Sequence, residues 1–296
     1  MVYGAVEAGG TKMCCCIGDE SGKIIRERVV ATGNPSDTFD SIAEFFIEYC
    51  NETSAVLDGI GLGWFGPINV DAKSEKYGLI GESPKVQWRN INVISEIKNR
   101  LNCLQGTIEV TTDVNASLLG ECWQGQAKGL SDICYITVGT GIGAGIMAGG
   151  KLVGGFSHPE FGHISVPRVK GDDYEGCCPT HGFCFEGMAS GPAMALRWGI
   201  PANELPNNHI GWDFEADYIA SAIVNLIFTF CPNKIILGGG VMHREGLLDL
   251  IVCKVEEKVA GYIDLSSVGG AENIVVLESL EGKQGMLGCI WLAIGN

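Results

Sequence analysis

The chain has 296 residues, of which 46% are hydrophobic and 19% charged, which is enough apolar material for two domains with packed cores. A net charge of −15 excludes the basic face that nucleic acids or anionic membranes require, and no apolar run reaches the roughly 18 residues that span a bilayer. The 13 cysteines and a first segment unlike a signal peptide favour reduced thiols in a cytoplasmic protein.

Strand-like and helix-like segments alternate along the first half of the chain, which predicts an α/β fold. Within residues 36–50, apolar side chains such as Ile42, Phe45 and Tyr49 recur at helical spacing. In chain order, the predicted strands cover 2–8, 13–18, 23–32, 56–64 and 107–113, and the predicted helices cover 36–50, 91–101 and 114–125.

The same pattern begins again near residue 132. Residues 132–153 repeat the layout of the N-terminus, with Tyr135 opposite Tyr3 and Gly141 opposite Gly9. This repetition predicts two similar α/β domains with an active-site cleft between them. A helix over 212–230, a strand over 233–240 and a final helix over 281–295 are predicted to follow.

Three glycine turns follow predicted strands. They are EAGGTK (7–12), GTGIGAG (139–145) and GGG (238–240). Glycines after a strand let backbone N–H groups approach phosphate oxygens, although for any one of these turns taken alone an ordinary hairpin is the favoured interpretation. Two turns at matching places in a duplicated pattern, with a third, favour a nucleotide site. Its candidate residues are Gly9, Gly10, Thr11, Lys12, Thr140, Gly141 and Gly239.

The stretch GCCPTHGFCFEG (176–187) brings three potential metal ligands together. Cys178, His181 and Cys184 are spaced three residues apart, a spacing that a tight loop can fold around one Zn²⁺ ion. The alternative is that the cysteines pack as small apolar side chains, but the polar and glycine neighbours make poor core material. Cys177 could replace Cys178 in such a site.

These motifs together resemble the ROK family of sugar kinases. EAGGTK, TTDVNAS, VGTGIGAG, HPEFGH, the cysteine–histidine cluster and LGGGV occur in the family's order, and EAGGTK and SPKVQW are most similar to its bacterial fructokinases. No helix-turn-helix segment precedes them, so the repressor branch fits less well. The resemblance implies two ribonuclease-H-like (actin-like) domains, which we place at 1–112, joined by the terminal helix 284–296, and at 113–283.

The resemblance also assigns catalytic roles. Asp113 follows a predicted strand and precedes a helix, and its position alone suits a helix N-cap as well as a general base. The family pattern DVNA makes it the base that activates a sugar hydroxyl, with Asn115 holding the loop. Glu7 is the candidate to hold Mg²⁺, through water, beside the phosphates of ATP.

For the hexose, the resemblance implies contacts from Asp113, Glu160, His163 and Glu186. Without the family pattern, both glutamates would be interpreted as solvated loop acids. Further residues are expected at the floor of the sugar pocket or close to the sugar: Gly66 and Pro67, with Lys85, Trp88 and His158 as less specific candidates.

The family pattern CPxHxxCxE favours Cys178 over Cys177, and His163 becomes the fourth zinc ligand beside His181 and Cys184. A Cys₂His₂ set leaves no open coordination position, which is typical of structural zinc. The ion would therefore order the loop that carries Glu186 and orient His163.

The sequence thus predicts an ATP-dependent fructokinase that forms fructose 6-phosphate, uses Mg²⁺, contains structural zinc and forms a homodimer, as the family does. One alternative is a kinase for glucose, mannose or an N-acetylhexosamine. Another is a non-catalytic sugar sensor, which would have no need of Asp113 as a base. A zinc hydrolase would require an open metal position.

Overall fold

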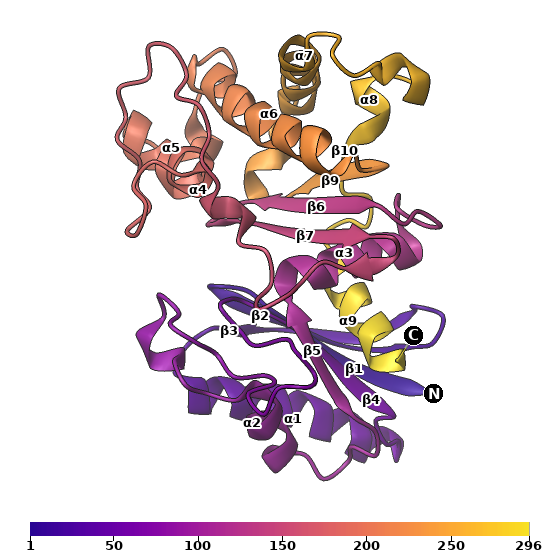
Figure 1. The fold of residues 1–296 in the computed structure, drawn as a ribbon. Coiled ribbons are helices and arrows are strands. Elements are labelled where there is room, and N and C mark those ends of the chain that lie inside the picture. Colours follow the sequence, from indigo (N-terminus) through magenta and orange to yellow (C-terminus); the bar gives the residue numbers. More distant parts are fainter. Residues whose placement is uncertain (296) are drawn as a thin grey trace. The chain divides into compact units, whose positions relative to one another are not determined.

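A computed structural model describes residues 1–295, which form two compact units, each built on a five-stranded sheet (Figure 1). The first unit comprises Met1–Gly129, Gly154–His158 and the chain from Ser279 onward. The second comprises Leu130–Val153 and Pro159–Glu278. The expected α/β class is confirmed.

The first unit contains the strands β1 (Val2–Ala8), β2 (Lys12–Asp19), β3 (Ile24–Ala31), β4 (Gly59–Trp64) and β5 (Ile108–Thr112). Their order in the sheet is β3-β2-β1-β4-β5. The hairpin partners β1–β2 and β2–β3 are antiparallel, whereas β1, β4 and β5 run parallel. Parallel pairing brings the carboxyl ends of β1, β4 and β5 to one edge of the sheet.

Helices cover both faces of this sheet (Figure 1). Because successive strand residues point to opposite faces, Cys15 joins the core beneath helix α1, while Cys14 and Cys16 face helix α9. Burial raises the pKa of the Cys15 thiol to about 12, as expected of a thiol that serves as apolar packing. The helices of this unit are α1 (Pro35–Thr53), α2 (Val93–Arg100), α3 (Asp113–Gln124) and α9 (Gln284–Ile294), with the short turn η1 (Val86–Trp88).

The second unit repeats this plan with the strands β6 (Ile133–Val138), β7 (Ile142–Ala148), β8 (Lys151–Leu152), β9 (Lys234–Gly238) and β10 (Val275–Leu277). Their order is β10-β9-β6-β7-β8, again with an antiparallel hairpin pair on one side and parallel strands on the other. Tyr3 in β1 and Tyr135 in β6 occupy the equivalent central strands, so the duplication predicted from the sequence is confirmed.

The remaining helices lie in the second unit. The long helix α6 supplies much of its core, and α7 packs along it (Figure 1). They are α4 (Phe185–Ala189), α5 (Gly191–Trp198), α6 (Gly211–Phe230), α7 (Leu247–Val259) and α8 (Ala271–Ile274), with the turns η2 (Phe161–His163), η3 (Ala202–Glu204), η4 (Gly240–His243) and η5 (Leu265–Val268).

Helix α3 belongs to the first unit, although the sequence placed the domain boundary just before it at Asp113. The reason is its contact with α9, in which glycines let the two helix backbones touch. A Cβ atom added to Gly288 would lie 1.7 Å from the Ala116 carbonyl oxygen, and one added to Gly120 would lie 2.0 Å from the Gln284 carbonyl oxygen. No sequence periodicity indicates such a contact.

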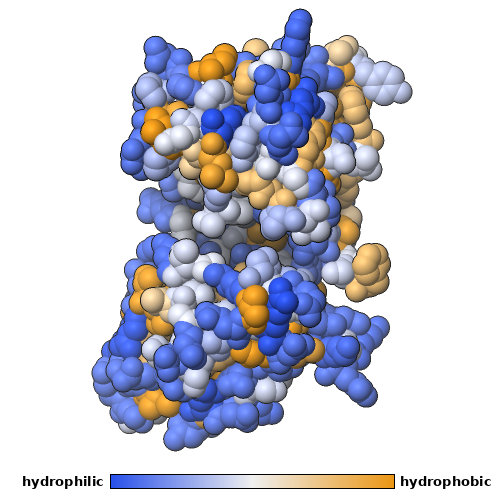
Figure 2. All heavy atoms as spheres, turned by 90° about the vertical axis from the view of Figure 1, so that its left-hand side faces the viewer, coloured by the Kyte–Doolittle hydropathy of each residue, from blue (hydrophilic) through white to orange (hydrophobic). Residues whose placement is uncertain are grey.

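The face drawn in Figure 2 is mainly hydrophilic, with hydrophobic residues scattered among the polar ones. This agrees with the large excess of acidic over basic residues. Among the described helices, none combines the length and the apolar character needed to pass through a lipid bilayer. All 13 cysteines are free thiols in the described part of the chain.

We expect Gly288→Ala to destabilise the protein by about 1–3 kcal/mol, because the new methyl group forces the backbones of α3 and α9 apart. Urea denaturation measures this change. Gly155→Ala is the matched control, since a Cβ at Gly155 meets no atom within 4 Å. Equal stability of the two variants would contradict the proposed backbone contact.

Candidate functional site

Predicted site residues of the first unit lie at one edge of its sheet. In the strand register, Glu7 of β1 is opposite Gly63 of β4, and Gly63 is opposite Thr111 of β5. Glu7, near the end of β1, is therefore level with the ends of β4 and β5. Strand β4 leads into Gly66–Pro67, and β5 leads into Asp113. The carboxyl edge of parallel strands is where open α/β sheets bind ligands.

Asp113 is the first residue of α3 and not its N-cap. The cap is Thr112, whose side chain accepts a hydrogen bond of 3.2 Å from the Asn115 N–H. The Asp113 carboxylate accepts from the Val114 N–H at 2.9 Å and is half-buried. Asn115 is buried and donates from its side chain to the Thr111 hydroxyl at 3.1 Å. A threonine caps the helix, so the capping role considered for Asp113 is excluded.

The Glu7 carboxylate packs against the start of α9. A Cβ atom added to Gly285 would lie 2.2 Å from the Glu7 carboxyl carbon, so the absence of a side chain there makes room for the carboxylate. Gly285 therefore helps to position a residue that is distant in the sequence.

The EAGGTK turn is the tip of the β1–β2 hairpin. Gly9 closes it by donating to the Lys12 carbonyl oxygen at 2.9 Å, while Gly10, Thr11 and Lys12 are exposed. The ammonium group of Lys85 donates to the Gly10 carbonyl oxygen. The two segments that resemble fructokinases thus contact each other.

Trp88, from the same segment as Lys85, is fully buried and does not line a surface. Its ring packs edge-on against Phe39 and Phe65, with ring centroids 5.5 Å apart in both pairs. The bond between Gly66 and Pro67, which directly follows Phe65, is cis. Trp88 therefore supports the Gly66–Pro67 segment from within the core.

The two glycine turns of the second unit are neighbours. Gly139 and Gly141 form the tip of the β6–β7 hairpin, and Gly239, with φ of +91°, follows β9, the parallel neighbour of β6. A Cβ on Gly239 would lie 2.5 Å from the Val138 carbonyl oxygen, so glycine is required there for close approach as well as for its dihedral angle. Thr140 is exposed at the tip of its turn.

A tyrosine–glutamate pair beside these turns was missed from the sequence. The Tyr135 hydroxyl donates to the Glu278 carboxylate at 2.6 Å. A Cβ on Gly238 would lie about 2 Å from the bonded oxygen atoms of both side chains, which explains a glycine at this strand end. The sequence singled out Tyr135 only as the repeat partner of Tyr3, which indicated duplication and not the pairing of Tyr135 with Glu278.

Glu186 reaches the first of these turns. Its carboxylate accepts a hydrogen bond of 2.9 Å from the Ile142 N–H, and it occupies the space beside Gly141. The turn η2, which ends at His163, packs against the same strand β7. Glu160 immediately precedes η2 and is exposed. The structure therefore brings Glu186 to the predicted phosphate turn, and its contact with sugar stays a prediction.

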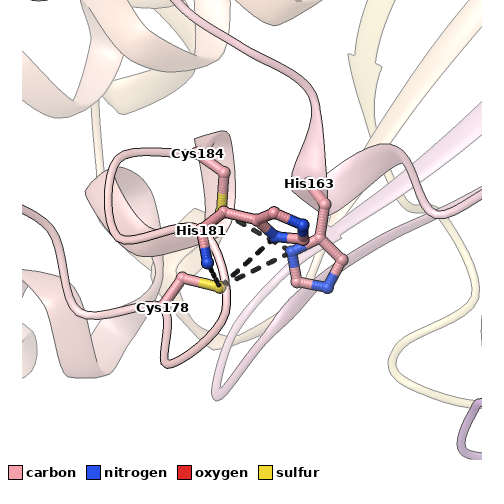
Figure 3. Close-up of side chains that lie close together, drawn as sticks. All are labelled: His163, Cys178, His181 and Cys184. Atoms are coloured by element: carbon pink, nitrogen blue, oxygen red, sulfur yellow. Dashed lines mark hydrogen bonds between the residues drawn. The ribbon is translucent and has the colours of Figure 1, made fainter.

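His163, Cys178, His181 and Cys184 point toward one another (Figure 3). Their potential ligand atoms all lie within 4.8 Å of one another, and Nδ1 of His163 is 3.8 Å from Sγ of Cys178 and 3.5 Å from Sγ of Cys184. Cys177 does not belong to the group. Both cysteines of the group are buried, whereas His181 is exposed.

This geometry fits a tetrahedral ion. Zinc–sulfur bonds of about 2.3 Å and zinc–nitrogen bonds of about 2.0–2.1 Å place sulfur and nitrogen ligands about 3.6 Å apart. Three of the four sulfur–nitrogen distances within the group are 3.5–3.8 Å, and all ligand atoms lie within 4.8 Å of one another. Burial raises the pKa of the Cys184 thiol to about 11. At neutral pH a metal ion that binds Cys184 as a thiolate must therefore displace the thiol proton.

A buried ion pair anchors the loop that carries the cluster. Arg197 of α5 lies 3.2 Å from the Asp172 carboxylate and donates to the Met188 carbonyl oxygen at 2.8 Å. Asp172 also accepts from the Tyr218 hydroxyl at 2.5 Å and from the Tyr174 N–H at 3.1 Å. Both charged side chains are almost fully buried, so this pair ties the loop to α4–α6.

Two similar five-stranded mixed sheets, with glycine turns at their strand ends and a cysteine–histidine group, define a class of two-unit α/β proteins. Comparison with protein families specifies it further. The ROK family model matches residues 3–296, and the chain belongs to the ROK family.

Individual relatives agree with this assignment. The chain is 37% identical to a fructokinase of Pediococcus pentosaceus over 99% of its length and 98% of the relative's. It is 41% identical to a fructokinase of Lactococcus lactis subsp. cremoris over 89% of its length and 87% of the relative's. The crystal structure of a ROK hexokinase from Thermus thermophilus superposes with a TM-score of 0.78 and 23% identity, covering 99% of this chain and 98% of that one, and so confirms the fold.

We expect the purified protein to contain a metal ion that is lost in Cys178→Ala and kept in Cys177→Ala, because of these two thiols only that of Cys178 lies within the group. Mass-spectrometric metal analysis of the purified variants measures the stoichiometry. Equal metal content in the two variants would contradict the assignment of ligands.

Proposed function

We propose that the chain transfers the γ-phosphoryl group of ATP to fructose and forms fructose 6-phosphate. The observation that carries the proposal is the likeness to fructokinases over nearly the whole of both chains. Relatives this similar make the chain a sugar kinase, and the choice of fructose is the proposal.

Asp113 is the proposed general base. A sugar hydroxyl is a weak nucleophile, and a carboxylate within hydrogen-bond reach accepts its proton as the oxygen attacks phosphorus. Three features support this role: a half-buried carboxylate, a place in the first turn of α3, and a separate residue, Thr112, that caps the helix. Buried Asn115 holds the turn in place from behind.

The glycine turns are the proposed phosphate-binding elements: Gly9–Lys12 in the first unit, and Gly139–Gly141 with Gly239 in the second. Exposed Thr11, Lys12 and Thr140 offer hydroxyl and ammonium donors beside the backbone N–H groups. Mg²⁺, when bound, neutralises phosphate charge, and we assign Glu7 to hold it through water. Support for Glu7 comes from its place at the same sheet edge as Asp113.

We assign the cysteine–histidine group to zinc and give the ion a structural role. Two thiolates and two imidazoles complete a tetrahedron and leave no position for a reacting water. The ion would fix Cys184, and therefore the first turn of α4, from which Glu186 extends. Hexose contacts from Glu160, His163, Glu186, Gly66 and Pro67 belong to this proposal, as do the homodimer and the cytoplasmic location.

We expect Asp113→Asn to lower kcat by about 10²- to 10⁴-fold and to leave the sugar Kd within about threefold, because the amide cannot accept the proton but retains the shape of the side chain. Coupled ADP-release kinetics and calorimetric titration with fructose measure the two quantities. Unchanged kcat would exclude Asp113 as the base. Absence of turnover in both proteins, with sugar still bound, would favour the sensor.

Comparison of kcat/KM for fructose, glucose, mannose and N-acetylglucosamine, with ATP–Mg²⁺ and zinc-replete protein, tests the substrate. We expect fructose to exceed the others by at least about tenfold, equivalent to about 1.4 kcal/mol of transition-state binding. A different preferred hexose would keep the kinase and overturn the assignment of fructose.

A further inference from the structure

One fully buried carboxylate of the first unit lies outside the proposed catalytic groups. Glu121, in the last turn of α3, has an exposed fraction of 0%. One of its oxygens accepts from the Ser279 N–H at 2.7 Å, and the other accepts from the Ser279 hydroxyl at 2.8 Å and the Gln126 N–H at 2.9 Å. Both oxygens act as acceptors, so all three hydrogen bonds are donated to the carboxylate.

The donors to Glu121 lie where the chain leaves one unit for the other. Within residues 1–295 there are four such crossings, and Gln126 and Ser279 stand beside two of them, Gly129/Leu130 and Glu278/Ser279. Glu121 therefore joins two crossing segments that are about 150 residues apart in the sequence.

At the Glu278/Ser279 crossing the hydrogen bonding changes unit between consecutive residues. The Glu278 N–H donates to the Leu237 carbonyl oxygen of the second unit at 3.0 Å, and the next N–H, from Ser279, donates to Glu121. At the other crossing, Ala127 donates to the Glu121 carbonyl oxygen at 3.1 Å.

Beyond Ala127, Gly129 has φ of +81° and a Cβ there would meet no atom within 4 Å. The hydrogen bonds to Glu121 thus reach only residues on the first-unit side of each crossing.

The space that the Glu121 carboxylate occupies depends on a glycine. A Cβ atom on Gly125 would lie 2.0 Å from a Glu121 carboxylate oxygen and 2.9 Å from the Ser279 hydroxyl. The chain turns away from α3 at a glycine that leaves this pocket open. The arrangement is built around the carboxylate, so its three accepted bonds are not incidental surface contacts.

We propose that Glu121 is a positioning residue that fixes the hinge of the kinase. It holds the first-unit ends of the two crossing segments to α3, so that Gly129 and the Glu278–Ser279 peptide, just beyond the bonds to Glu121, are the flexible links to the second unit. Asp113 begins the same helix, two turns earlier, which makes α3 the rigid link between the hinge and the base. The kinetic part of this inference rests on the proposed function.

Glu121→Gln tests the hinge directly by limited proteolysis. Exposed Lys128 lies in the first crossing segment, and a glutamine offers one acceptor oxygen to three donors, so we expect tryptic cleavage after Lys128 to be at least about tenfold faster. Glu109→Gln is the matched control, a carboxylate of the same unit that accepts from the Tyr77 hydroxyl at 2.9 Å. Cleavage within twofold of the wild-type rate would overturn the proposal, whether or not the protein is a fructokinase.

Kinetics test the positioning role. At a temperature where circular dichroism shows Glu121→Gln to be folded, we expect kcat to fall about tenfold and the fructose Kd to change less than threefold. Fast cleavage together with wild-type kcat would show that the hydrogen bonds of Glu121 serve stability alone, and would overturn its positioning role. Where Glu121→Gln does not fold, Ser279→Ala removes only the hydroxyl donor, and we expect cleavage about threefold faster; an unchanged rate would likewise overturn the proposal.

Discussion

The proposed site in the first unit depends on the contact of α9 with β4 and α3 across positions that carry no side chain. A Cβ atom on Gly61 would lie 1.9 Å from the Cys289 carbonyl oxygen, and Gly120 and Gly288 allow equally close approaches between helices. Because α9 lies this close, Gly285 reaches the Glu7 carboxylate and α3 is held with Asp113 at the sheet edge. Protein interiors tolerate little extra volume, so this geometry permits few alternatives.

Features set by local pattern were predictable from the sequence. The duplicated strand–turn–strand order follows from spacing, and the group of Cys178, His181 and Cys184 follows from ligand types within one short loop. His163 lies 15 residues before Cys178, and only the family resemblance connected them. The choice between Cys177 and Cys178 depended on which thiol turns inward, and spacing alone did not determine it.

Features set by tertiary contact were not predictable. Glu186 has the sequence context of a loop acid, and its bond to the Ile142 N–H exists because α4 and η2 pack against β7. Glu121 lies on a predicted helix, but its three donors belong to Gln126 and Ser279, which are about 150 residues apart in the sequence. The first boundary was placed before α3 for the same reason, since the contact between α3 and α9 joins distant parts of the chain.

Completion of the first unit by α9 has a consequence for synthesis on the ribosome. Of the described elements, α9 is the last to be made, yet it closes a core that contains Tyr3, Ala5 and Cys16. The second unit holds its five strands and its helices between Leu130 and Glu278 and is fully synthesised earlier. The second unit can therefore fold before the first is complete, and until α9 is made only α3 covers the face of the first sheet that carries Tyr3, Ala5 and Cys16.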